Sequence, residues 1–239
     1  VLEFVLLLNE KDYNLFRLRK DIHRNLEEKN LDTAEKLLQS YQSVMPKKQV
    51  LHEQYYLWGK AELLQKRGAS KEEIKAVLNE AILLTKPFFG KRKNTSDLYS
   101  EMEIKLFLRL IQFSEDISWK EAELKRMLLF TRKYDSKKIK EQAEMSILKE
   151  LASIQEEKGD AQKELEYIEQ ALTLVKESRT MRGLAELHFK KAGLLKELMQ
   201  RNKDMQQEYQ KQCQVELTMA YYTALVMDNV ELVQKIKTT

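Results

Sequence analysis

The sequence has few of the residues that build strand turns, disulfides or metal sites. Its 239 residues include six glycines, two prolines, three histidines and one cysteine, Cys213. A single cysteine excludes an internal disulfide framework and is typical of a reduced, cytoplasmic environment. Scarce glycine and proline disfavour a β protein, whose many turns need these residues. The composition therefore predicts an all-α protein.

Long apolar runs and a large charge excess are missing as well. The longest apolar cluster near the start covers residues 4–8, and five residues cannot cross a bilayer. No basic segment precedes this cluster, as a secretory signal would require. The 42 Lys and Arg residues exceed the 38 Asp and Glu residues by only four, and both signs alternate along the chain. We expect neither membrane contact nor direct nucleic-acid binding.

Motifs that carry catalysis or bind metals are missing too. The sequence has no Gly-rich phosphate loop, no Cys or His pair at metal spacing and no nucleophile motif. The three histidines, His23, His52 and His188, fall on different predicted helix pairs, where we interpret them as solvated or partly packed. Acidic pairs near helix ends are better explained by solvation than by acid-base catalysis. The sequence predicts no enzyme activity, no metal and no cofactor.

The sequence does contain amphipathic helical hairpins, most clearly at residues 136–179. Apolar residues recur at helical spacing on both sides of Gly159-Asp160, at Leu148, Leu151 and Ala152 before it and at Leu165, Ile168, Ala171 and Leu172 after it. Glycine favours the end of a helix and aspartate the start of the next. The order of small and large residues resembles the tetratricopeptide repeat, whose hairpins need neighbours to cover their second apolar side.

Further copies of this hairpin account for the rest of the chain. Ser70 with Glu73, and Ser118 with Glu121, are predicted to cap second helices of pairs. Because the chain begins in mid-pattern at Val1, we interpret residues 1–12 as the remnant of a connecting helix. The fold expected is a right-handed α-solenoid of five helix pairs with a C-terminal capping helix. The pairs cover residues 13–46, 47–87, 97–134, 136–179 and 180–227, and the cap covers 228–238.

In such a solenoid the first helix of each pair lines a concave groove. We placed the groove positions one residue after the expected core positions, which in the second pair are Leu57, Ala61 and Leu64. The predicted peptide-binding residues are Tyr55, Trp58, Gln65, Lys105, Arg109, Gln112, Lys149, Ser153 and Lys190. Basic side chains pair with carboxylates, and glutamine satisfies both polarities of a backbone. This lining fits a short extended peptide with a carboxylate, although each residue taken alone also fits an ordinary solvated surface.

The whole arrangement, ending in the segment AYYTALVMDNVELVQKIK at 220–237, resembles the C-terminal receptor domain of Rgg/PlcR-type regulators, the RRNPP group of Gram-positive bacteria. The resemblance implies a cytoplasmic homodimer that binds an imported signalling peptide and shifts the arrangement of N-terminal helix-turn-helix domains on DNA. That domain is absent from this sequence, so DNA contact is expected only through it. Because end repeats expose apolar surface, we hypothesise dimer contacts at Tyr221, Tyr222 and Leu225.

Two other functions remain open from the sequence. A general tetratricopeptide scaffold for a partner protein shares the fold and would bind no short peptide. A response-regulator phosphatase of the related Rap type needs an N-terminal three-helix bundle that carries the catalytic group, and only a stub precedes the first pair here. Peptide titration separates the scaffold from the receptor, and phosphate loss from a phosphorylated response regulator would indicate the phosphatase.

Overall fold

The computed structural model describes residues 10–87, 89, 99–131, 133–134, 136–178, 181 and 183–239. Of these described residues, 83% are helical and none is in a strand, which confirms the all-α class. The predicted connecting-helix remnant falls mostly on residues 1–9, which lie outside the described residues. The α-helices are Glu10–Glu27 (α2), Leu31–Val44 (α3), Val50–Lys66 (α4), Lys71–Leu83 (α5), Glu101–Gln112 (α6), Ile117–Thr131 (α7), Lys137–Lys158 (α8), Ala161–Ser178 (α9), Leu184–Arg201 (α10), Gln206–Val226 (α11) and Val230–Lys237 (α12).

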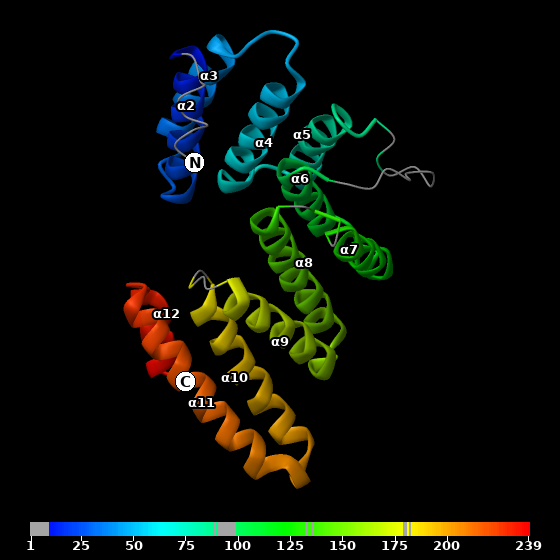
Figure 1. Cartoon of the computed structure of the whole chain (residues 1–239), viewed down its shortest axis with the longest axis vertical. Coiled ribbons are helices and arrows are strands. Elements are labelled where there is room, and N and C mark those ends of the chain that lie inside the picture. The colour runs from blue at the N-terminus through cyan, green and yellow to red at the C-terminus, as the bar shows by residue number, and fades with distance from the viewer. Residues whose placement is uncertain are drawn as a thin grey trace. The chain divides into compact units, whose positions relative to one another are not determined.

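The helices form two compact units, one ending at Ser114 and the other starting at Glu115. In the first unit each helix from α2 to α6 packs against its neighbour in the chain, and α4 also contacts α2 and α6. The first helices of successive predicted pairs therefore lie side by side there (Figure 1). The predicted third pair is divided, because α6 belongs to the first unit and α7 to the second. That one continuous array covers both units stays a prediction.

In the second unit α7 to α12 likewise pack in chain order (Figure 1). The predicted hairpin at residues 136–179 is confirmed as α8 and α9. Its apolar faces meet in one core cluster, which includes Leu148, Ala152 and Ile168. α10 packs against both α9 and α11, so it is covered on two sides. No helix that the structure describes is long and apolar enough to cross a membrane.

Local signals set most of the helix boundaries. Gly159 takes a left-handed φ of +70°, and the Asp160 side chain accepts a hydrogen bond from the Lys163 N–H at 3.1 Å, as a helix stop and start require. Ser70 accepts a hydrogen bond from the Glu73 N–H at 3.2 Å, which confirms its predicted capping role. These turns form because their side chains satisfy backbone groups that the helix leaves unpaired.

One predicted cap is wrong. Ser118 was expected to begin the helix, but α7 starts at Ile117, and the Asp116 side chain accepts a hydrogen bond from the Trp119 N–H at 2.9 Å. Asp116 occupies the capping position two residues earlier, so Ser118 lies within the helix. A full capping box occurs instead at Ser100 and Glu103, where each side chain bonds the other residue's backbone N–H.

Candidate functional site

In the first unit, the predicted aromatic groove residues lie in a packed cluster between α2, α3 and α4. Tyr55 and Trp58 are each only 7% exposed, and Tyr41 is fully buried. The rings of Tyr55 and Trp58 lie 5.5 Å apart, and the guanidinium of Arg19 lies 4.6 Å from the centre of the Tyr55 ring. The Tyr55 hydroxyl donates to the Arg19 carbonyl at 2.9 Å. These aromatic side chains thus help to join α2 to α4, and contact with a ligand stays a prediction.

A short hydrogen-bond chain extends from this cluster to His52. Arg19 Nε donates to the Tyr41 hydroxyl at 2.7 Å, and this hydroxyl lies 2.6 Å from His52 Nδ1. Burial lowers the pKa of His52, and the nearby Arg19 charge lowers it further. Both effects favour a neutral imidazole whose Nδ1 accepts the Tyr41 proton. The chain needs no external ligand to satisfy these groups.

The predicted polar groove residues of α4 and α6 mostly have partners within the first unit. Arg109 binds the carboxylate of Glu62 through two nitrogens, at 2.7 and 2.9 Å, and also donates to Gln112 Oε1 at 3.3 Å. Lys105 pairs with Glu101 at 2.8 Å. Gln65 lies exposed near the end of α4. The positive charges expected to attract a carboxylate are thus largely neutralised on this surface.

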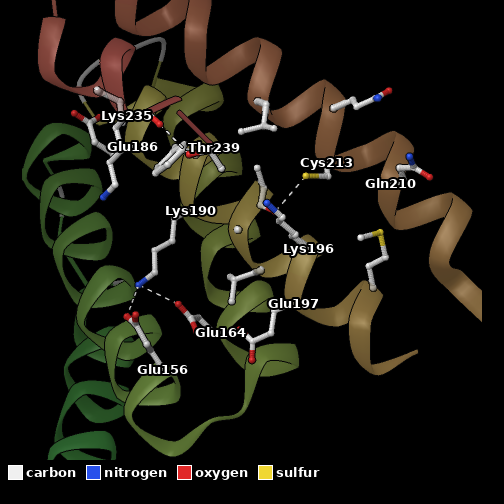
Figure 2. A pocket seen from close by; sticks show the side chains of 18 residues that line it. Glu156, Glu164, Glu186, Lys190, Lys196, Glu197, Gln210, Cys213, Lys235 and Thr239 are labelled. Carbon is white, nitrogen blue, oxygen red and sulfur yellow. Dashed lines mark hydrogen bonds and ion pairs between the residues drawn. The ribbon is translucent and has the colours of Figure 1, made fainter. Parts of the chain in front are cut away.

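The second unit contains a cavity of about 660 Å³ along one face of α10, which we call the α10 cavity (Figure 2). α11 and α12 provide most of the remaining lining, and α8 and α9 add one glutamate each. Its apolar surface comes from the side chains of Phe189, Ala192, Leu194, Met199, Leu217 and Leu232. The volume is in the range of ligand sites, and the lining combines these apolar side chains with ten polar or charged residues. Of the predicted peptide-binding residues, only Lys190 lines it.

Lys190 joins three helices at one end of the α10 cavity. Its ammonium binds Glu156 of α8 at 2.9 Å and Glu164 of α9 at 3.0 Å (Figure 2). Burial raises the pKa of Glu164, although the Lys190 charge opposes this effect. Burial also disfavours the charged form of Lys190, but its bonds to Glu156 and Glu164 outweigh this and raise its pKa. Lys190 is therefore a structural cation as well as a lining residue.

The opposite part of the α10 cavity is bordered by Lys196, Cys213 and Gln210 (Figure 2). Lys196 has no ion pair or ring contact within the described residues. The Cys213 thiol donates to the Ala192 carbonyl at 3.4 Å, and burial raises its pKa, so at neutral pH it is a thiol rather than a reactive thiolate. This part of the cavity thus presents one uncompensated positive charge.

Lys149 and Ser153, the other two predicted residues in the second unit, lie on α8 and do not line the cavity. Lys149 is exposed, and its ammonium lies close to the backbone of Gly183, where an added Cβ would come within 2.8 Å of Nζ. Ser153 is half-buried. The structure therefore separates the predicted residues into the packed aromatic cluster and the α4 and α6 surface of the first unit, Lys190 in the α10 cavity, and these two positions outside it.

One face of α11 carries an exposed apolar stripe. Val215, Met219, Tyr222 and Val226 follow one another at helical spacing and are 59%, 45%, 63% and 71% exposed. At 100° per residue this stripe lies on the side of α11 opposite the residues that line the α10 cavity. Among the predicted dimer contacts, Tyr222 and Leu225 are exposed. Tyr221 is half-buried and packs against a small core cluster formed by Ala185, Ala224, Leu232 and Val233.

His188 was expected to be solvated or partly packed, but it is only 4% exposed. Its Nδ1 lies 2.5 Å from Glu216 Oε2, and Glu216 also pairs with Lys191 at 3.2 Å. Burial acts against the Glu216 carboxylate, but the bonds from His188 and Lys191 outweigh this and lower its pKa. This buried ionic group fastens α10 to α11. The sequence carried no signal for it, because Glu216 lies 25 or more residues after His188 and Lys191.

Sequence reasoning also missed three features of the cavity. Gly193 is exposed and lines the cavity, but it was not among the predicted binding residues. Lys196 and Lys235, which line the cavity, were not among the predicted residues. A glycine inside an otherwise regular helix was the one signal available, since glycine costs about 1 kcal/mol there relative to alanine.

No family model matches the chain, and no curated protein matches it.

Proposed function

We propose that this chain is a peptide-binding domain and that the α10 cavity holds a short linear peptide. The observation that carries the proposal is the combination of apolar walls with unpaired polar groups in one cavity. The side chains of Gln210 and Gln214 line the cavity from α11, one turn apart, and their amides have no hydrogen-bond partner in the described part of the chain. Each amide can donate to a carbonyl and accept from an N–H, which suits an extended peptide backbone.

The charges of the cavity also support a peptide with an anionic group. All four lining glutamates have partners: Lys190 holds Glu156 and Glu164, an Arg201 nitrogen lies 2.5 Å from Glu197, and the Asn229 amide donates to Glu186 at 3.0 Å. Lys196 and Lys235 have no carboxylate partner among the described residues. Pairing with a ligand carboxylate would satisfy them.

In this proposal the chain belongs to a tetratricopeptide-like, right-handed solenoid that acts as the cytoplasmic receptor of a peptide-responsive transcription regulator. The support is the packing of α2, α4 and α6 side by side and the resemblance of the repeat pattern and terminal segment. The peptide would then alter the arrangement of N-terminal DNA-binding domains. A general scaffold that binds a protein partner is the alternative, and it shares every feature of the fold.

The partner surface that goes with this function is the α11 stripe, through which we propose that two copies associate. An antiparallel copy of α11 would place apolar side chains on apolar side chains about a two-fold axis. The stripe faces away from the α10 cavity, so a dimer formed this way leaves the cavity open. Val226→Asp should convert the dimer into a monomer in sedimentation equilibrium at micromolar concentration, whereas Gln234→Asp, also exposed, should not. A monomeric parent chain would contradict this part of the proposal.

Affinity selection tests peptide binding directly. The chain is incubated with a synthetic library of short linear peptides, the complex is separated by size exclusion, and bound peptides are identified by mass spectrometry. Selected peptides are then titrated by calorimetry. Saturable binding at one site per chain is the expected result. If no library member binds, the chain is not a peptide receptor, and the scaffold becomes the better assignment.

A further inference from the structure

Gly193 lies near the middle of α10, where glycine is the least favourable ordinary residue except proline. A Cβ built on Gly193 would meet nothing within 4 Å. The other mid-helix glycine, Gly59, differs, because its Cβ would lie 2.6 Å from the Leu38 side chain. Close packing of α3 on α4 therefore accounts for Gly59. No neighbour among the described residues accounts for Gly193, which leaves an open notch in the wall of the α10 cavity.

The residues one turn away on each side of the notch define its chemistry. Phe189 precedes Gly193 by four residues and Lys196 follows it by three, so all three lie on one face of α10. Phe189 is held by Lys235, whose ammonium lies 5.4 Å from the centre of its ring. Lys196 has no such contact among the residues described. The notch therefore has an apolar border toward the start of α10 and a positive charge about one turn, roughly 5 Å, further along.

We propose that this notch holds the C-terminal residue of the bound peptide, with its apolar side chain against Gly193 and its α-carboxylate at Lys196. The inference rests on the proposed function and adds which end of the peptide is recognised. An internal Asp or Glu brings a carboxylate but no apolar side chain on the same residue. A chain end with an apolar last residue presents both groups on one residue, which matches the one-turn spacing of Gly193 and Lys196.

The test uses peptides selected by the parent chain, each made with a free C-terminal carboxylate and as the C-terminal amide. Amidation should weaken binding about tenfold, the loss expected for one charge-assisted hydrogen bond. Lys196→Met should weaken the free acid by a similar factor and should leave the amide unaffected. Lys211→Met removes the same charge from α11 outside the cavity and should change neither affinity.

Gly193 is tested by two substitutions, both of which we expect to keep the fold because an added Cβ meets nothing within 4 Å. Gly193→Leu should fill the notch and weaken binding at least about tenfold, while the melting temperature stays equal or rises because leucine favours the helix. Gly193→Ala should raise the melting temperature similarly and weaken binding much less, because it adds only a methyl group. Circular dichroism checks that both variants are folded, and the alanine variant remains informative if the leucine variant is not.

The outcomes separate this inference from the broader proposal. If no peptide binds the parent chain, the proposed function fails. A second outcome is that peptides bind while amidation, Lys196→Met and Gly193→Leu each change the affinity by less than about twofold. In that case the peptide's C-terminus does not lie in the notch, and the inference is overturned. Loss of affinity on Gly193→Leu without any effect of amidation would overturn the carboxylate assignment.

Discussion

Lys190 should contribute to stability even without a ligand, because Glu164 depends on it. The Glu164 side chain is only 4% exposed and its carboxylate lies 3.0 Å from the Lys190 ammonium. Lys190→Met removes this cation and leaves the glutamate buried with no positive charge beside it. At an effective dielectric constant of about 20, two unit charges at this distance attract by roughly 5 kcal/mol. Lys190 is 35% exposed, so solvent screening reduces the net loss to about 2–3 kcal/mol at neutral pH.

Urea unfolding followed by circular dichroism measures this loss. The matched comparison is the double variant Lys190→Met with Glu164→Met, which replaces the pair with two unbranched apolar side chains. It should lose less stability than Lys190→Met alone, because it leaves no buried charge unpaired. If the double variant is as unstable as the single one, the loss comes from packing and the electrostatic reasoning is refuted.

The loss caused by Lys190→Met should also depend on pH. Burial already raises the pKa of Glu164 above its ordinary 4.5, and removal of Lys190 raises it further. A carboxyl with a raised pKa in the folded state binds a proton more readily there than in the unfolded chain. Folding is then penalised above the folded-state pKa and relieved as the pH falls toward 4.5. The deficit of the variant relative to the parent should therefore shrink with acidification. A deficit that stays constant down to that pH would contradict this explanation.

Two further predictions concern other ion pairs. Hydrogen bonds from Lys125 and Lys158 lower the pKa of Glu121 from 4.5 to about 2, so its carboxylate stabilises the fold above pH 4.5 and this contribution is lost as the pH falls toward 2. Glu121→Gln should therefore make stability depend less on pH between these values. An unchanged acid-unfolding profile would count against this explanation. Arg109→Met should lower the free energy of unfolding, measured with urea, by about 2 kcal/mol, because Glu62 stays buried without the two nitrogens that bind it. The double variant Arg109→Met with Glu62→Gln should recover part of this loss. An equal loss in the single and double variants would show that the charge is unimportant.

Lys190 is a poor choice for testing peptide contact, because it also holds helices together. Substitution of Lys190 would reduce peptide affinity by loosening the helices around the cavity even if no peptide touches it. Lys196 forms no ion pair within the described residues, so its substitution breaks no salt bridge between helices. Substitutions of Lys196 and Gly193 are therefore better tests of peptide contact than a substitution of Lys190.

The sequence by itself determined where most helices start and stop, because these signals act over three or four residues. Gly159 with Asp160, and Ser70 with Glu73, satisfy backbone groups within one turn, so their role can be read without the rest of the fold. The apolar spacing likewise identified the faces that pack between α8 and α9. Where two capping residues competed, as at Asp116 and Ser118, the short pattern gave the wrong one.

Only the tertiary structure decided which polar faces are open. The register that placed Trp58 one residue beyond the core could not foresee that α4 is flanked by both α2 and α6, which together leave Trp58 and Glu62 buried. Arg109 lies 47 residues from its partner Glu62, and Lys190 lies 34 residues from its partner Glu156. No local sequence pattern reaches that far. A helix pattern fixes the side on which a residue lies, whereas the packing of distant helices fixes whether that side meets protein, a cavity or solvent.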